Sequence, residues 1–254
     1  MLTVSILIPT YNQTPDYLAA AVSSALWQTH PCQIIVVDDG SEPRQEEIIK
    51  RELHRKYGPF YDNDTVQYVW QENRGVAGAL NRALELATGD YIQWLPSDDV
   101  YTQARTELML KHLLREEAVI GYSAWEDGLP GATTTWPAPC YPTQMEFFEA
   151  LKRHCFVNAA TVMWHRLVFQ EVGIFDTNMV HAQDYEFLLR CAEKHNFLGV
   201  NEPLVRRRRH EKQMLNTLRE PQEAEKKRRD MEYIRQRYGA SGNVWLPEKK
   251  DEKA

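Results

Sequence analysis

The chain has 254 residues, of which 43% are hydrophobic and 26% are charged, and its formal net charge is −6. This composition excludes a disordered chain, and no apolar run approaches the ~18–20 residues of a membrane span. Residues 206–237 contain 12 Lys and Arg against 6 Asp and Glu, so the rest of the chain has a net charge of −12. A protein with such an acidic body lacks the broad basic face that binding of duplex DNA requires, and we expect no nucleic-acid partner.

The first hundred residues alternate short β-branched runs with helical patterns, which predicts a parallel sheet with crossover helices. The predicted strands cover residues 4–8, 33–37, 65–70 and 91–95. The helices predicted between them cover residues 15–26, 42–57 and 76–87. Three of these strands end in polar loops, and ligands of open α/β sheets bind beyond the carboxyl ends of strands, so we expect the loops to converge on one site.

The second half of the chain is less regular. Helical patterns cover residues 102–116, 146–154, 184–194 and 221–238, and strand patterns cover residues 119–125 and 161–164. Residues 128–142 contain four prolines and two glycines, and we expect a loop there that covers a site or connects two elements. The four cysteines are far apart with no CxxC pair, which argues against a zinc ribbon or a disulfide framework and fits a reducing cytosol.

Two adjacent carboxylates, Asp98 and Asp99, follow the fourth predicted strand. Neighbouring carboxylates are costly to hold together unless a cation or a proton separates their charges. Mg²⁺ or Mn²⁺ prefers oxygen ligands and commonly holds substrate phosphates as well, which makes this pair a candidate metal site. The alternative is a solvated turn in which an Asp caps the helix that begins near residue 102.

A second pair of carboxylates, Asp38 and Asp39, follows the second predicted strand. These side chains can accept hydrogen bonds from a ribose hydroxyl or a pyrimidine N3–H. Capping of the next helix by Asp39 or Ser41 is the alternative. Tyr11, after the first strand, can stack on a base, or it is simply a surface aromatic residue.

Several well-known catalytic motifs are absent from the sequence. No GxGxxG opens the first helix and no GxxxxGK(S/T) occurs, so neither the usual dinucleotide-binding fold nor a P-loop is supported. The GxSxG nucleophile elbow is absent too.

Five motifs, in order along the chain, resemble those of family 2 glycosyltransferases with the GT-A fold. The motifs are Ser5-Ile6-Leu7-Ile8-Pro9-Thr10-Tyr11-Asn12, Val36-Val37-Asp38-Asp39-Gly40-Ser41, Asn73-Arg74-Gly75, Gly89-Asp90-Tyr91 leading to Ser97-Asp98-Asp99, and Gln183-Asp184-Tyr185-Glu186-Phe187-Leu188-Leu189-Arg190. The resemblance runs from residue 2 to about residue 210. It implies an α/β fold with a mostly parallel nucleotide-binding sheet flanked by helices and with a C-terminal helical extension.

The resemblance also implies how the chain is organised. Residues 1–218 would form the glycosyltransferase domain, with the nucleotide-binding half in 1–100 and the acceptor-binding half in 101–218. Residues 219–254 would form a basic helical tail.

The implied donor is a nucleotide-sugar, usually a UDP-sugar. The residues that the resemblance assigns to the nucleotide are Pro9, Thr10, Tyr11, Asp39, Asn73, Gly75, Ser97 and Asp98. The first four hold the nucleobase, Asn73 and Gly75 lie near the base and the ribose, and Asp98 faces the ribose or the donor sugar.

The resemblance assigns the chemistry to three further residues. Asp99 would bind the Mn²⁺ or Mg²⁺ that bridges the diphosphate, and Asp184 would be the general base of an inverting transfer. His210 would complete the metal site; alternatively it belongs to a solvated basic run. The sequence departs from the family at Gln183, where many members have Glu, and after His210, where no Ser or Thr follows within a few residues.

We therefore expect a cytoplasmic, metal-dependent glycosyltransferase that transfers a sugar to a saccharide or a lipid-linked acceptor in surface polysaccharide or glycoconjugate synthesis. A nucleotidyltransferase is a second candidate, but it would need a Gly-rich, basic loop after the first strand, which residues 9–14 lack. The third candidate is a non-catalytic nucleotide-sugar-binding protein, which would tend to lose some of these carboxylates.

The last predicted helix, residues 221–238, is cationic and carries an apolar stripe of Met231, Ile234 and Tyr238. Such a helix can lie on an anionic membrane surface, which would make the protein peripheral at the inner face of the membrane. We favour the alternative, in which the stripe packs on the domain, because interspersed carboxylates dilute the positive charge and the stripe is narrow.

Overall fold

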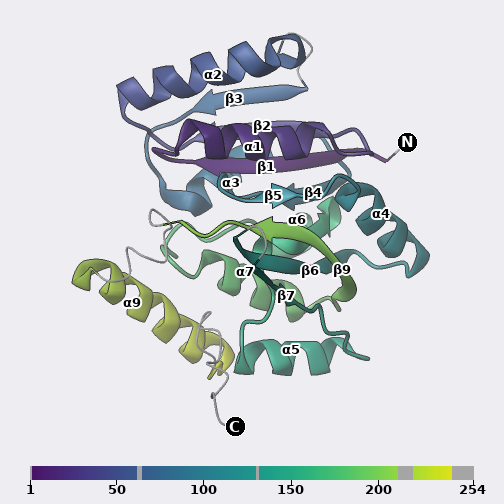
Figure 1. The fold of residues 1–254 in the computed structure, drawn as a ribbon. Coiled ribbons are helices and arrows are strands. Elements are labelled where there is room, and N and C mark those ends of the chain that lie inside the picture. The colour runs from purple at the N-terminus through teal and green to yellow at the C-terminus, as the bar shows by residue number, and fades with distance from the viewer. Residues whose placement is uncertain (1, 62–64, 130–131, 211–219, 242–254) are drawn as a thin grey trace.

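One mixed β-sheet forms the centre of the protein, and helices cover both of its faces (Figure 1). The computed structural model describes residues 2–61, 65–129, 132–210 and 220–241. In these residues the strands follow the order β3-β2-β1-β4-β8-β6-β9-β5, and β7 pairs with β6. The strands are β1 (Val4–Thr10), β2 (Gln33–Asp38), β3 (Val66–Trp70), β4 (Tyr91–Trp94), β5 (Val100–Tyr101), β6 (Ile120–Leu129), β7 (Ala132–Trp136), β8 (Val162–His165) and β9 (Leu198–Arg207). The helices are α1 (Pro15–Leu26), α2 (Pro43–Tyr61), α3 (Gly75–Leu86), α4 (Arg105–Arg115), α5 (Gln144–Arg153), the 3₁₀-helix η1 (Ala159–Thr161), α6 (Arg166–Val172), α7 (Gln183–Ala192) and α9 (Pro221–Tyr238).

The first half of the sheet is parallel, as the sequence predicts. β1 pairs with β2 and with β4, and β2 pairs with β3. β1 is apolar nearly throughout because both of its faces are covered. Its residues Ile6 and Ile8 pack against α1 and α2 on one face, and Leu7 packs against α3 on the other. The carboxyl ends of all four strands therefore meet at the same edge of the sheet.

The second half of the sheet contains antiparallel pairs. β8 runs antiparallel to both β4 and β6, and β6 runs parallel to β9. Two successive antiparallel pairings leave β6 and β9 running in the same direction as β4. All three strands therefore end at the same edge of the sheet.

The expected loop at residues 128–142 is wrong in its first part. β6 extends to Leu129 and pairs with β7, so that Gly128 lies opposite Thr133. Three consecutive threonines, 133–135, favour the strand because they are β-branched, and Pro137 comes only after it ends. Pro130 and Gly131 lie outside the described residues.

The sequence analysis also misses β9, together with the short elements β5 and α6. The apolar run of β9 is interrupted by Asn201, Glu202 and Pro203, which hides the strand. The structure accommodates the interruption with a register shift, and Pro203 lies opposite Ala124 of β6.

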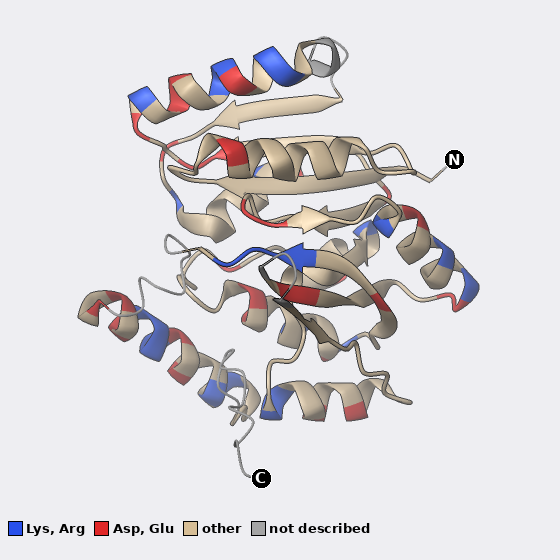
Figure 2. Cartoon of the chain, viewed as in Figure 1, with Lys and Arg blue, Asp and Glu red and all other residues tan. Residues whose placement is uncertain are grey.

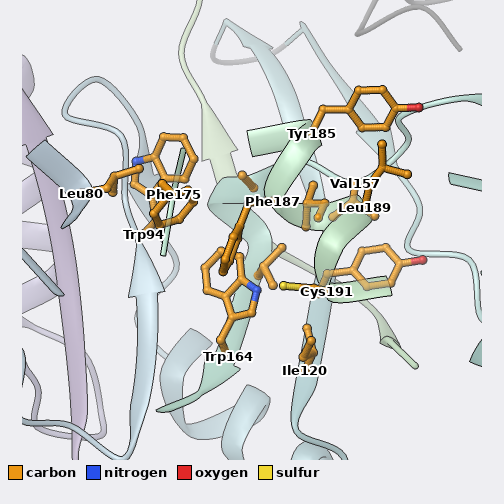
Figure 3. Close-up of a cluster of buried hydrophobic side chains, with 14 of the residues drawn as sticks. Leu80, Trp94, Ile120, Val157, Trp164, Phe175, Tyr185, Phe187, Leu189 and Cys191 are labelled. Atoms are coloured by element: carbon orange, nitrogen blue, oxygen red, sulfur yellow. The ribbon is translucent and has the colours of Figure 1, made fainter. Parts of the chain in front are cut away.

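The largest apolar cluster lies on one face of the sheet, where it runs from α3 in the first half to α7 in the second; Figure 3 shows its α7 part. Phe187 of α7 stacks on Phe169 with ring centroids 5.3 Å apart, and it packs against Trp164 at 6.0 Å. The apolar stripe of α9 is buried in the same cluster, as the packing alternative expects. The surface that α9 presents to solvent is consequently charged (Figure 2). Across the described ranges, no helix has both the length and the apolar character needed to cross a membrane.

Candidate functional site

The polar residues that follow β1, β2, β3, β4, β6 and β9 gather at one edge of the sheet. Figure 2 shows the acidic loop after β4 beside the basic stretch at the carboxyl end of β9. The 3₁₀-helix η1 contacts both β4 and α7, so α7 borders the same edge. This edge holds the loops that contain the predicted nucleotide-binding residues, and α7, which carries Asp184, borders it.

Two carboxylates fix the loop after β2: Asp38, the last residue of the strand, and Asp39, the first residue of the loop. Oδ1 of Asp38 accepts a hydrogen bond from the Ser41 backbone N–H at 2.9 Å, and Oδ2 accepts one from the Tyr68 hydroxyl at 2.5 Å. Oδ1 of Asp39 accepts hydrogen bonds from Nε2 of Gln71 at 2.7 Å and from the Arg74 backbone N–H at 2.9 Å. Asp39 thus joins the loop after β2 to the loop after β3.

Burial raises the pKa of Asp39, and the hydrogen bonds from Arg74 and Gln71 oppose that rise. Gly40 beside it has φ +84°, and a Cβ there would lie 2.8 Å from the backbone nitrogen of Asn73. Only glycine therefore lets these two loops come so close. α2 begins at Pro43, so neither Asp39 nor Ser41 directly precedes it, and both side chains bond to neighbouring loops instead.

The loop after β1 is tied to two of its neighbours. The Asn12 backbone N–H donates to Oγ of Ser41 at 2.7 Å, and Nε2 of Gln13 donates to Oγ of Ser97 at 3.1 Å. Tyr11 lies at the outer end of this loop with 55% of its surface exposed. The predicted nucleotide-binding residues are thereby brought together at one place.

Asp98 and Asp99 have different surroundings. Asp99 is 3% exposed, and its Oδ1 accepts a hydrogen bond from the backbone N–H of Arg208 at 3.1 Å. Oδ2 of the half-buried Asp98 lies 2.9 Å from Nε2 of His210. Burial and the charge of Asp98 raise the pKa of Asp99 well above its ordinary value, and Arg207 and Arg208 oppose this rise. The helix-capping alternative is wrong, because α4 begins at Arg105 with Ala104 at its N-cap.

The basic stretch after β9 is paired with a carboxylate that the sequence analysis misses. Asp127, at the end of β6, is 3% exposed and accepts two hydrogen bonds from Arg209, while Nε of Arg207 lies 3.4 Å from its Oδ1. The His210 ring lies against that of Tyr17 of α1, with ring centroids 4.8 Å apart and the rings tilted by 41°. A charged residue within a largely apolar strand could have identified Asp127 as a functional candidate. The sequence pattern, however, predicts that this strand ends at residue 125.

Asp184 is the second residue of α7 and lies half-buried at the start of that helix. Its Oδ1 accepts a hydrogen bond from the Tyr185 backbone N–H at 2.8 Å. Burial raises the pKa of Asp184, and the positive charge of Lys227 on α9 opposes this rise. Asp184 in turn helps burial to raise the pKa of the Cys155 thiol.

The donors near the acidic loop suit a divalent cation. In the part of the chain that the structure describes, no three His, Cys, Asp or Glu side chains enclose a metal position by themselves. Mg²⁺ and Mn²⁺ commonly take only one or two protein carboxylates and complete their coordination with substrate phosphates and water. Asp98, with the His210 imidazole 2.9 Å away, and the neighbouring Asp99 could supply one or two such ligands, which fits that mode of binding.

Comparison with known sequences shows which protein family the chain matches. The sequence model described as glycosyl transferase family 2 matches residues 5–172. An uncharacterized glycosyltransferase of Rickettsia prowazekii, RP339, is 30% identical over 223 residues; the match covers 84% of this chain and 66% of that protein, just under two thirds of its length. The putative teichuronic acid biosynthesis glycosyltransferase TuaG of Bacillus subtilis is 33% identical over 204 residues, covering 80% of this chain and 77% of TuaG. WfgD of Escherichia coli, a UDP-Glc:alpha-D-GlcNAc-diphosphoundecaprenol beta-1,3-glucosyltransferase, is 26% identical over 204 residues, covering 78% and 73%.

Solved structures with the same architecture are more distant in sequence. TarS 1–349 of S. aureus, in complex with UDP-GlcNAc, has a TM-score of 0.67 and 14% identity, covering 94% of this chain and 73% of that one. The mannosyltransferase PcManGT of Pyrobaculum calidifontis, in complex with GDP-Man and Mn²⁺, has a TM-score of 0.58 and 19% identity, covering 82% and 56%. These likenesses confirm the expected fold and, at such identities, the fold alone.

Proposed function

The chain belongs to glycosyl transferase family 2, and from that premise we propose that it is a metal-dependent, inverting glycosyltransferase that uses a UDP-sugar. The acceptor in this proposal is a hydroxyl group of a saccharide or of a lipid-linked saccharide. The observation that supports it most strongly is that Asp39, Asp98 and Asp99 lie in loops at one edge of the sheet, with Asp184 half-buried in the first turn of the bordering helix α7.

In this proposal the first hundred residues bind the nucleotide. The exposed ring of Tyr11 offers a stacking surface to the base, next to Asp39 in the adjacent loop. The carboxylate of Asp39 is held in place by two neighbouring groups and can accept a hydrogen bond from the base. Asn73 and Gly75, both exposed at the start of α3, would meet the ribose.

Asp99 and His210 would hold the divalent cation, and Asp98 would face the ribose or the donor sugar. When bound, the cation would neutralise the two negative charges on the leaving diphosphate as a Lewis acid. The chain itself prepares the position, because the Arg208 backbone N–H orients the buried Asp99 carboxylate. His210 lies within hydrogen-bond distance of Asp98 and so ties the stretch after β9 to the acidic loop after β4.

The half that follows residue 100 would supply the acceptor site and the base. Asp184 would take the proton of the acceptor hydroxyl while that oxygen bonds to the anomeric carbon. The bond between the anomeric carbon and the diphosphate oxygen breaks at the same time and its electrons stay with the diphosphate. A single base opposite the leaving group gives inversion, and the raised pKa of Asp184 makes it a stronger base than an exposed Asp.

The relatives support a UDP-sugar and a role in polysaccharide synthesis. TuaG is named for teichuronic acid biosynthesis, and WfgD for transfer from UDP-Glc to a diphosphoundecaprenol-linked sugar. TarS was solved with UDP-GlcNAc, and PcManGT with Mn²⁺. With a lipid-linked acceptor the protein would work in the cytoplasm at the inner face of the membrane.

A nucleotide-release assay tests the proposal. The full chain is incubated with a panel of UDP- and GDP-sugars and Mn²⁺, with and without saccharide or diphosphoundecaprenol-linked acceptors. We expect one UDP-sugar to release UDP, faster with an acceptor and not in excess chelator, and NMR to show an inverted anomeric centre in the product. Pyrophosphate release from a nucleoside triphosphate and a sugar phosphate would instead identify a nucleotidyltransferase.

A further inference from the structure

One carboxylate of α9, that of Asp230, binds the backbone at the start of α7. Oδ2 of Asp230 accepts hydrogen bonds from three consecutive backbone N–H groups, those of Val180, His181 and Ala182, at 2.8, 2.7 and 3.2 Å. Asp230 is 5% exposed. A buried carboxylate is costly unless it is hydrogen-bonded, and hydrogen bonds to a charged acceptor are stronger than neutral ones. The contact between α9 and residues 180–182 is therefore specific.

α7 has no cap of its own at this end. Its N-cap residue is Ala182, whose side chain makes no capping hydrogen bond. Alanine is among the poorest residues at this position, and the N–H groups at a helix start carry partial positive charge. Asp230 supplies a carboxylate to this helix start from 48 residues further along the chain.

Two other contacts keep α9 against α7. Oε2 of Glu223 lies 2.7 Å from Nε2 of His181, and the Tyr238 hydroxyl donates to Oε1 of Glu186 at 2.9 Å. Together with Asp230 they span most of the length of α9, which Figure 1 shows next to α7. Removal of Asp230 alone should therefore leave α9 docked.

We propose that Asp230 is a positioning residue, which holds the first turn of α7 and with it Asp184 in the geometry for proton transfer. This inference rests on the proposed function, in which Asp184 is the general base. Asp184 lies two residues after Ala182, the N-cap residue of α7, whose backbone N–H Asp230 holds. A displacement of a reacting group by 1 Å can cost about 10²-fold in rate, so a frayed first turn should slow the transfer without affecting the nucleotide.

The first experiment replaces Asp230 by Ala in the full chain. We expect kcat to fall about 10–100-fold, with KM for the UDP-sugar unchanged, because the nucleotide loops lie on other elements. The matched control is Glu232→Ala, which removes another α9 carboxylate, one that is bonded only to Gln236 and Arg235 of the same helix in the contacts of the described residues. Asp230→Asn keeps an oxygen acceptor and should recover part of the lost rate.

A second experiment asks whether Asp230 acts through Asp184. In an Asp184→Asn background, Asp230→Ala should have little further effect on kcat, since a base that is absent cannot be misplaced. Hydrogen exchange measured by mass spectrometry should show faster exchange in residues 180–187 of Asp230→Ala, and unchanged exchange in β1 and β2.

Several outcomes would overturn the inference: an unchanged kcat, a change in KM alone, additive effects of the two substitutions, or unaltered exchange at the start of α7. If Asp230→Ala does not fold, the same kcat and exchange measurements on Asp230→Asn decide, with a smaller loss expected. If the wild-type chain transfers no sugar, the proposed function fails, and the exchange data still decide whether Asp230 orders this turn.

Discussion

The two halves of the molecule hold their site residues by different means. In the first half, Asp39 is bonded to the loop after β3, and the loop after β1 is bonded to the loops after β2 and β4. Adjacent parallel strands bring these loops together, so the topology itself provides the contacts. Where the halves meet, Asp99 accepts a hydrogen bond from the backbone of Arg208, 109 residues away, and in the second half α7 is anchored by α9.

The difference has a functional consequence. A nucleotide site built from neighbouring loops of one parallel sheet shares its contacts among many groups. The groups that we assign to the reaction depend instead on long-range contacts, such as those of Asp99 with Arg208 and of Asp230 with residues 180–182. Substitutions in the first half should therefore change substrate binding, and those in the second half should change the rate of transfer.

Asp99 lies where the halves meet, and its loss should have the largest effect. Asp99→Asn is expected to abolish transfer and to weaken UDP binding in the presence of Mn²⁺, measured by nucleotide release and by calorimetric titration. The variant should fold, because burial already disfavours the charge that it removes. Asp90→Asn, at the opposite end of β4, is the control. Full activity of the Asp99 variant, or of the wild type in excess chelator, would contradict the assignment.

Asp184→Asn should distinguish most clearly between an effect on the rate of transfer and an effect on nucleotide binding. Acid–base catalysis by a positioned side chain is worth ~10²–10⁴-fold, so kcat should fall by at least that range. The affinity for UDP, measured by titration, should stay unchanged because the nucleotide loops are untouched. Asp176→Asn, in the loop before α7, should behave like the wild type. Transfer at a near wild-type rate would refute the role of Asp184 as the base.

Asp39→Ala should show the opposite pattern, with a smaller effect. Loss of a charged hydrogen-bond acceptor for the base should raise KM for the donor about 10–100-fold, which corresponds to ~1.4–2.7 kcal/mol, with kcat nearly unchanged. Steady-state kinetics together with a thermal melt would measure both effects. A large fall in kcat at an unchanged KM would contradict the division between the halves.

The same division explains what the sequence can predict. The strands and the site residues of the first half follow from apolar runs that end in polar loops, because the fold places the ends of consecutive parallel strands together. β9 and the contact of Asp127 with Arg209 do not follow, since Pro203 interrupts the strand pattern and the partners are 82 residues apart. The helix 221–238 is predicted correctly as an element, but nothing local signals that Asp230 binds the start of α7.

The last prediction concerns pH and has the smallest effect. Burial raises the pKa of Asp184, so transfer should fall on acidification at a higher pH than an exposed Asp would give, since only the ionised carboxylate accepts a proton. The charge of Lys227 favours that ionised form. Lys227→Gln should therefore raise the pKa of Asp184 and move the acid limb of the kcat profile to higher pH, while kcat at the alkaline plateau stays the same.

Arg228→Gln is the control for this shift, because the guanidinium of Arg228 is exposed and paired with Glu225 on the same helix. The profiles should be measured at constant ionic strength, since salt screens exposed charges more than buried ones. If both variants moved the acid limb equally, the effect would come from the net charge of α9. If neither moved it, Lys227 would not act on the base, and the influence of α9 on the reaction would be limited to the backbone contact that Asp230 makes.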